Sequence, residues 1–118
     1  MIEQSKAWGY TTEILVTPSF ELHKIFVERG GYCSIHEHTG KNNSFYILSG
    51  VLQITEWINE EKVHKLLRAN DLYTCDKGVR HQFKAISQVD ALEIYHSRID
   101  PKDIIRYSKG GIECLGLS

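Results

Sequence analysis

The stretch GGYCSIHEHTGKNNSFYILSG, residues 30–50, carries the pattern on which the expected fold and function depend. It places His36 and His38 two residues apart. On a β-strand, residues two apart project to the same face, so both imidazoles are expected to enter one space. If that space is the interior of a barrel, the imidazoles need polar partners, and a metal ion satisfies them well.

A third candidate ligand is His81, which follows the turn Asp76–Gly78 far along the chain. A third imidazole from a distant strand is what a facial metal site needs. An HxH pair taken alone is more often a surface feature than a ligand pair, so the wider pattern has to decide. The other histidines, His23, His64 and His96, lack such pairing and are expected at the surface or hydrogen-bonded in the core.

Outside this stretch, short runs rich in Ile, Val, Leu, Phe, Tyr and Thr alternate with turn residues at fairly even intervals. The count and spacing of these runs predict an all-β fold, a sandwich or a barrel. The predicted strands are Thr12–Val16, Glu21–Glu28, Tyr32–His38, Phe45–Leu48, Val51–Ile58, Val63–Arg68, Leu72–Cys75, His81–Ile86 and Ala91–Ser97. The predicted turns lie at Ser49–Gly50, Asn59–Glu61, Asn70–Asp71 and Lys77–Gly78.

One short helix is expected near the end of the chain. Asp100 suits the N-cap, Pro101 suits the first helical position, and Asp103 favours the helix dipole. Ile104, Ile105 and Tyr107 would form its apolar side, and Gly110–Gly111 would end it.

Length and composition exclude several classes of protein. The 118 residues form one domain, residues 1–118, and 14 basic against 15 acidic residues leave a net charge of −1. That balance argues against nucleic-acid binding. No apolar run approaches the roughly 18 residues of a spanning helix, and the first residues lack the apolar core of a signal peptide. Three cysteines, an odd number, favour reduced thiols and a cytoplasmic location.

The spacing of these residues resembles the two sequence motifs of the cupin superfamily. The residues in register with the first motif are Gly30, His36, His38 and Gly50, and Asn43 stands where the motif has a glutamate. Gly78 and His81 match the second motif. The resemblance implies a double-stranded β-helix, the cupin jelly roll, closed as a barrel around a metal-binding cavity.

Within that superfamily, the chain most resembles the C-terminal domain of type II mannose-6-phosphate isomerases. The resemblance covers nearly the whole chain, from Trp8-Gly9 to the segment 103–107. Three positions differ from it: this chain has His36 for a glutamine, Asn43 for the ligand glutamate and Lys41 for an arginine. The resemblance implies a sugar phosphate as substrate.

These departures change the expected donor set. His36, His38 and His81, with Asn43 as a weaker neutral ligand, would hold a divalent metal with one negative charge fewer. Such a set favours metals that bind imidazole, so zinc, iron, nickel or copper is expected. Manganese stays among the candidates. The departures also remove a possible general base for sugar isomerisation.

Four residues are candidates for binding a substrate. Lys41 follows the histidine pair, where the resemblance places an arginine near the sugar phosphate. Arg80 directly precedes His81 and could reach the same rim, although its strand parity points it outward. Phe45 and Phe83 have the parity expected of cavity-lining residues. Two cations beside a divalent metal would favour an anionic small molecule.

Glu93 is the best remaining carboxylate for the site. Leu92 and Ile94 share the opposite face of its strand, which favours a solvated, outward position for Glu93. Tyr46 and Tyr95 could supply phenol groups, although packing is the more common role of such residues in barrels.

Three functions remain open. The first is a metal-dependent enzyme acting on a sugar, a sugar phosphate or another small polar metabolite. The second is an iron(II) dioxygenase with a three-histidine site. The third is a non-catalytic module that binds a metal or a small ligand. A homodimer is expected, because edge strands must be covered and the segment Trp8–Val16 is apolar enough to pair between chains.

Overall fold

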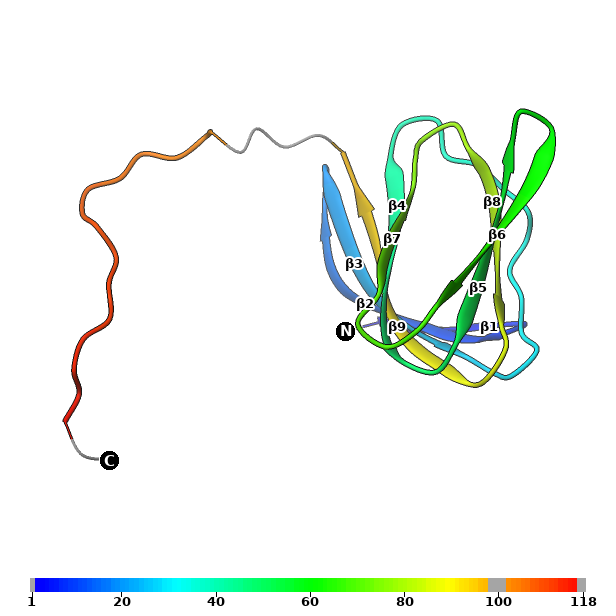
Figure 1. Ribbon diagram of the computed structural model, residues 1–118, viewed down its shortest axis with the longest axis horizontal. Helices are drawn as coiled ribbons and strands as arrows, with labels where there is room; N and C mark the ends of the chain where they lie inside the picture. The colour runs from blue at the N-terminus through cyan, green and yellow to red at the C-terminus, as the bar shows by residue number, and fades with distance from the viewer. Residues whose placement is uncertain (1, 98–101, 117–118) are drawn as a thin grey trace.

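The computed structural model of the protein describes residues 2–97 and 102–116 (Figure 1). Within them the chain forms nine β-strands, and every strand pairing is antiparallel. The strands are β1 (Ile2–Lys6), β2 (Gly9–Thr17), β3 (Phe20–Val27), β4 (Asn42–Ser49), β5 (Leu52–Ile58), β6 (Glu61–Leu67), β7 (Leu72–Cys75), β8 (Arg80–Ala85) and β9 (Val89–His96). The all-β prediction is therefore confirmed.

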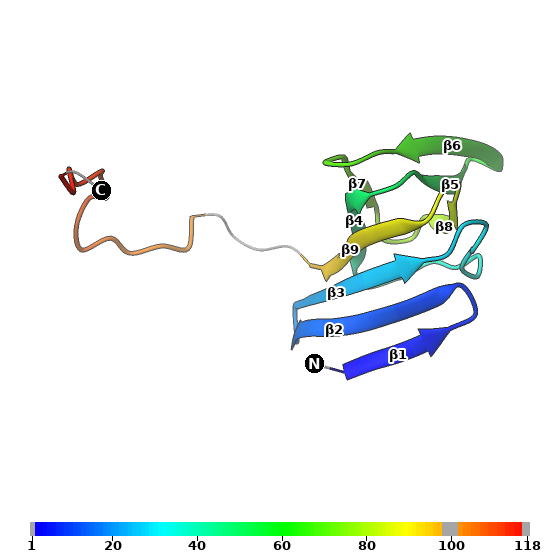
Figure 2. The same cartoon turned by 90° about the horizontal axis from the view of Figure 1, so that it is seen from below.

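The strands form two sheets that face each other. The larger has the order β1-β2-β3-β9-β4-β7, and the smaller has the order β6-β5-β8. Figure 2 shows β1 and β2 continuing the larger sheet beyond the strands of the smaller one. In the described residues no strand of one sheet pairs with a strand of the other, so the expected closed barrel is not found. The architecture is a two-sheet sandwich.

The predicted C-terminal helix is not seen. Residues 102–116 contain no helix and run as an extended segment (Figure 1), while Asp100 and Pro101 lie outside the described residues. Ile105 and Tyr107, which were expected on the apolar side, are 79% and 95% exposed. A short helix that packs on nothing is marginal in water, because most helical stability in proteins comes from tertiary packing. No helix able to cross a membrane occurs in the part of the chain that the structure describes.

The segment between β3 and β4 also differs from the prediction. The predicted strand Tyr32–His38 contains only two isolated bridges, from Tyr32 to Lys84 and from His36 to His81. Between them, the Phe83 N–H donates to the Cys33 sulfur at 3.2 Å. Here a side-chain sulfur accepts the hydrogen bond in place of a backbone carbonyl. The segment therefore follows the edge of β8 without forming a regular ladder.

The inward face of the strands changes from apolar to polar along their length. On β3 the inward side chains Ile25 and Val27 are fully buried, whereas His23, two residues earlier on the same face, is polar. The same change occurs on β4, β5, β8 and β9. The buried apolar residues on these five strands are Ile25, Val27, Phe45, Ile47, Leu52, Ile54, Phe83, Ala85, Val89 and Ala91. The buried polar residues at the other end of these inward rows are Asn43, Glu56, His81 and Glu93. The sandwich therefore has an apolar half and a polar half.

Gly50, in the turn between β4 and β5, tests this packing. Its φ is +88°, and a Cβ built there would lie 2.0 Å from the carbonyl oxygen of Gln88. We expect Gly50→Ala to lower the free energy of unfolding by about 2 kcal/mol, from the left-handed backbone and the clash together. Urea unfolding would measure this. Gly40→Ala is the control, because open space surrounds Gly40; an equal loss in both variants would contradict the explanation.

Candidate metal centre

Three imidazoles meet in the polar half of the sandwich. His36 and His38 come from the irregular segment before β4, and His81 comes from β8. Their ligand atoms all lie within 4.8 Å of one another. The ring centroids are 4.6 Å apart for His36 and His81, and 5.0 Å apart for His36 and His38. The spacing prediction for these three residues is therefore borne out as a cluster that could hold one metal ion.

Backbone hydrogen bonds place the histidines. The His36 N–H donates to the His81 carbonyl at 3.0 Å, and the His81 N–H donates back at 2.8 Å. The Gly78 N–H donates to the His38 carbonyl at 2.7 Å. These three bonds join the two motifs of the sequence, so the imidazoles converge although one of the two segments is not a strand.

Hydrogen bonds also orient the imidazole rings. His81 Nδ1 lies 2.9 Å from the carbonyl oxygen of Val79, and His36 Nδ1 lies 2.8 Å from that of Ser34. A carbonyl oxygen only accepts, so each Nδ1 carries the hydrogen. In the neutral ring Nε2 then keeps its lone pair, which is the arrangement in which imidazole binds a metal.

The third imidazole supplies the strongest sign of a metal. His38 Nε2 is buried and has no hydrogen-bond partner among the described residues. Burial, together with the neighbouring charges of His36, Lys41 and His81, lowers the pKa of His38 to about 4. Burial also lowers the pKa of His81. Neutral imidazoles with an unpaired buried nitrogen fit a divalent cation, since a buried polar atom without a partner is costly.

Asn43 borders the cluster on β4 and is fully buried. Its Oδ1 lies 3.1 Å from His81 Nε2, and its Nδ2 donates to Glu93 Oε2 at 3.3 Å. Because His81 Nε2 keeps a lone pair in the neutral ring, two acceptors face each other across this gap. A cation between them would satisfy both, so Asn43 fits the donor set as an oxygen ligand.

Two cavities adjoin the histidines. The first has a volume of about 460 Å³, and His38, Thr39, Lys41 and Tyr95 are among its lining residues. The second has a volume of about 500 Å³, and its lining includes His36, Glu93, Lys6 and Phe83. The histidine cluster can therefore be approached from two sides.

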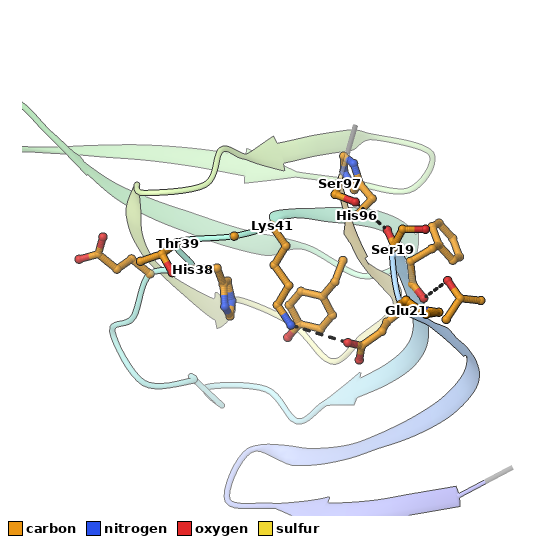
Figure 3. Close-up of a pocket in the computed structure, with 13 residues that line it drawn as sticks. Ser19, Glu21, His38, Thr39, Lys41, His96 and Ser97 are labelled. Atoms are coloured by element: carbon orange, nitrogen blue, oxygen red, sulfur yellow. Dashed lines mark hydrogen bonds and ion pairs between the residues drawn. The ribbon is translucent and has the colours of Figure 1, made fainter. Parts of the chain in front are cut away.

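Lys41 stands in the wall that the two cavities share. Its Nζ lies 3.8 Å from Glu21 Oε2 and 4.0 Å from the centre of the Tyr95 ring. Figure 3 shows the Lys41 side chain running past His38 toward Glu21. The ion pair is about one-third exposed on each side, and such pairs are weak, so the ammonium remains available to an anion entering either cavity.

The remaining sequence candidates lie in different places. Phe45 belongs to the apolar core, and its ring packs 5.9 Å from that of Phe83. Phe83 is buried and lines the second cavity. Arg80 is exposed at the start of β8 and lines neither of these two cavities.

The other histidines are hydrogen-bonded outside the cluster. His23 bonds to Glu21 at 3.0 Å, His64 to Thr55 at 2.8 Å, and His96 to Ser44 at 2.8 Å.

Sequence reasoning placed Glu93 wrongly. The residue is 8% exposed and points inward, although its pattern favoured a solvated face. The outward neighbours Leu92 and Ile94 are half-buried on the outer face of a central strand, so an apolar pair there did not mark the interior. Burial raises the pKa of Glu93, while hydrogen bonds from Asn43 and Tyr95 act against the rise. The sequence did contain a signal for the inward position: Glu93 is two and four residues from Ala91 and Val89, so it shares their face of β9.

Comparison with known proteins supports the same type of fold. The sequence model described as "Cupin domain" matches residues 23–96. A search of curated protein sequences gives no significant match. The solved structures that the chain resembles include KdgF from a Halomonas species, with a TM-score of 0.71 and 17% identity over 85% of this chain and 89% of that one.

Two further similar structures belong to chains that this chain covers less completely. Oxalate decarboxylase from Lactobacillus farciminis, a formate complex, has a TM-score of 0.71 and 17% identity. The match covers 80% of this chain and 30% of that one. The Cnp3 cupin domain of Schizosaccharomyces pombe has a TM-score of 0.71 and 16% identity, over 83% of this chain and 69% of that one. At such identities the likeness concerns the fold.

Metal analysis of protein purified without a histidine tag tests the centre. We expect about one divalent ion per chain, and His81→Ala should lower the metal content at least about tenfold, because it removes a ligand from a small donor set. His64→Ala is the matched control, since His64 bonds to Thr55 outside the cluster. Stoichiometric metal in a variant with all three cluster histidines replaced by alanine would place the metal elsewhere.

Proposed function

Because the chain belongs to the cupin domain family, we propose that it binds a divalent metal at His36, His38 and His81 and acts on a small anionic metabolite, such as a sugar phosphate. The observation that carries the proposal is the three-histidine cluster between two polar cavities. The proposed metals are zinc, iron, nickel and manganese. Manganese is included because Mn(II) centres are described for the similar oxalate decarboxylase of Bacillus subtilis.

The residues around the cluster divide the work. A bound divalent cation would supply Lewis acidity toward a substrate oxygen. The three imidazoles would hold it, and the amide oxygen of Asn43 would serve as a fourth, neutral ligand. Phe83 would present an apolar wall to the substrate in the second cavity.

Positive side chains in the cavity walls support an anionic ligand. Lys41 lines both cavities, and Lys6 lines the second. Glu21 offsets part of this charge through its pair with Lys41. A phosphate or carboxylate would replace the carboxylate of Glu21 as the partner of the ammonium, and lysine would bind it as a point charge with loose directional preference.

Two other functions compete with this one. The three-imidazole donor set also suits an iron(II) dioxygenase, and iron content with oxygen consumption would favour it. A non-catalytic ligand-binding module would bind the same molecules without turnover. Incubating the metal-loaded protein with aldose and ketose phosphates and following the products by NMR separates these alternatives.

We also propose that the protein is located in the cytoplasm, where Cys33, Cys75 and Cys114 would stay free thiols.

The anion proposal predicts a charge-dependent affinity. In calorimetric titrations of the metal-loaded protein, a sugar phosphate should bind at least about tenfold more tightly than its parent sugar. Lys41→Ala should remove most of that difference, because hydrogen bonds to charged groups contribute about 1.5–3 kcal/mol. Lys24→Ala is the control, since Lys24 is exposed and lines neither cavity. Equal affinities for both ligands in wild type and Lys41→Ala would contradict the role of Lys41.

We also propose that the chain forms a homodimer through the β1 edge. The segment Trp8–Val16 cannot provide the edge, because its strand β2 is already paired with β1 and β3. β1 is instead the last strand of the larger sheet, it is exposed throughout, and Ile2 in it is 68% exposed. An exposed edge is a template for pairing with a second copy.

Light scattering tests the dimer. We expect a species of about twice the 13.6 kDa chain mass at micromolar concentration. Ile2→Asp should shift it toward the monomer, because the charge would be buried at the edge contact. Val63→Asp, on the exposed strand β6, is the control. A clean monomer for the wild type would refute the proposal.

A further inference from the structure

The buried pair of Asn43 and Glu93 joins β4 to β9 beside the histidine cluster. Asn43 is fully buried and Glu93 is 8% exposed. Their side chains meet at 3.3 Å, with Asn43 Nδ2 donating to Glu93 Oε2. The hydroxyl of Tyr95 is the other side-chain partner of the Glu93 carboxylate. Glu93 borders the second cavity, but its carboxylate is already engaged by these two donors.

The chemistry of the two groups decides which way the Asn43 amide faces. The Asn43 Nδ2–H donates to Glu93 Oε2, and a carboxylate oxygen accepts, so the NH₂ end of the amide faces Glu93. Oδ1 is then turned to the opposite side, where it lies 3.1 Å from His81 Nε2. Val79 holds the hydrogen of His81 on Nδ1, so Nε2 offers a lone pair to the same gap. Two acceptors are thus presented together at the edge of the cluster.

We propose that Glu93 is a positioning residue, which accepts the Nδ2–H of Asn43 and so keeps Oδ1 aimed at the metal as its oxygen ligand. The inference rests on the proposed metal function. The cupin motif has a glutamate at position 43, where this chain has the neutral Asn43. In this chain the carboxylate would stand on β9 instead, one hydrogen bond from the metal ligands, and would act through the Asn43 amide.

A glutamine at this position would lose the orientation. Its own NH₂ could donate to Asn43 Oδ1, which would let the amide turn and present its NH₂ to His81 Nε2. That nitrogen would then be hydrogen-bonded and unavailable to the metal. The shape and size of the buried side chain would be nearly unchanged, so the substitution separates orientation from packing.

The first experiment measures metal affinity by competition with a chromophoric chelator, using Zn²⁺ and Co²⁺. We expect Glu93→Gln to weaken binding about 10- to 100-fold, the range found for groups that orient metal ligands. In the Co²⁺-loaded protein its visible spectrum should match that of Asn43→Ala, because both lose the same oxygen ligand. Asp90→Asn is the control: it removes a carboxylate from the same strand, where Asp90 accepts a bond from Ser49 and lines neither cavity, and it should leave affinity and spectrum unchanged.

Two further variants show whether Glu93 acts through Asn43. In the Asn43→Ala background, adding Glu93→Gln should weaken binding by less than about threefold, since the group being oriented is already gone. Glu93→Asp keeps the charge but shortens the side chain, so it should weaken binding as Glu93→Gln does. This variant also serves if Glu93→Gln fails to fold, which circular dichroism would show.

The outcomes separate this inference from the metal proposal. Wild-type affinity and an unchanged Co²⁺ spectrum in Glu93→Gln or Glu93→Asp would overturn the positioning role while leaving the three-histidine site in place. Full additivity with Asn43→Ala would overturn it as well, because Glu93 would then act by its charge alone. A wild type that binds neither Zn²⁺ nor Co²⁺ would overturn the metal function itself and this inference with it.

Discussion

Strand register fixes where the interior of this sandwich changes from apolar to polar. Side chains two residues apart share a face, so each strand contributes an inward row. The pairings of Ile25 with Ala91 and of Ile54 with Phe83 bring apolar residues to one level. The next inward pair on the smaller sheet, Glu56 with His81, is polar. A slip of one residue on β4, β5, β8 or β9 would turn the polar side chain of that strand outward and remove it from the site.

The polar half is held together by hydrogen bonds where the other half is held by packing. Glu56 is buried and accepts a bond from the Tyr73 hydroxyl, and burial together with that carboxylate raises the pKa of Tyr73. Asn43 and Glu93 form the corresponding pair on the larger sheet. Buried polar groups are tolerated only when they are partnered, so the unpaired Nε2 of His38 stands out in the described interior. This contrast is the physical basis for assigning a ligand to the cluster.

A regular strand is not needed to align the histidines. The reciprocal bonds between His36 and His81, at 3.0 and 2.8 Å, fix the two backbones at the point where alignment matters. The irregular run around Cys33 is compatible with this, since its bonds to Phe83 keep it on the edge of β8. Lys77 N–H also donates to Asn42 Oδ1 at 2.9 Å, which ties the loop before His81 to the start of β4. Both ligand segments are therefore anchored to sheets.

The sequence by itself determined the all-β class, the turns and the three histidines, because alternation, positive-φ residues and motif spacing are local properties. Asn59, Asn70 and Gly78 all have positive φ at predicted turns. It missed β1, whose polar residues carry no alternation, and it predicted a helix that finds no partner surface. Only the tertiary structure decided that Glu93 points inward and meets Asn43. The two residues are 50 positions apart, and the face that β9 turns to the interior depends on its pairing with β3 and β4, which no local pattern records.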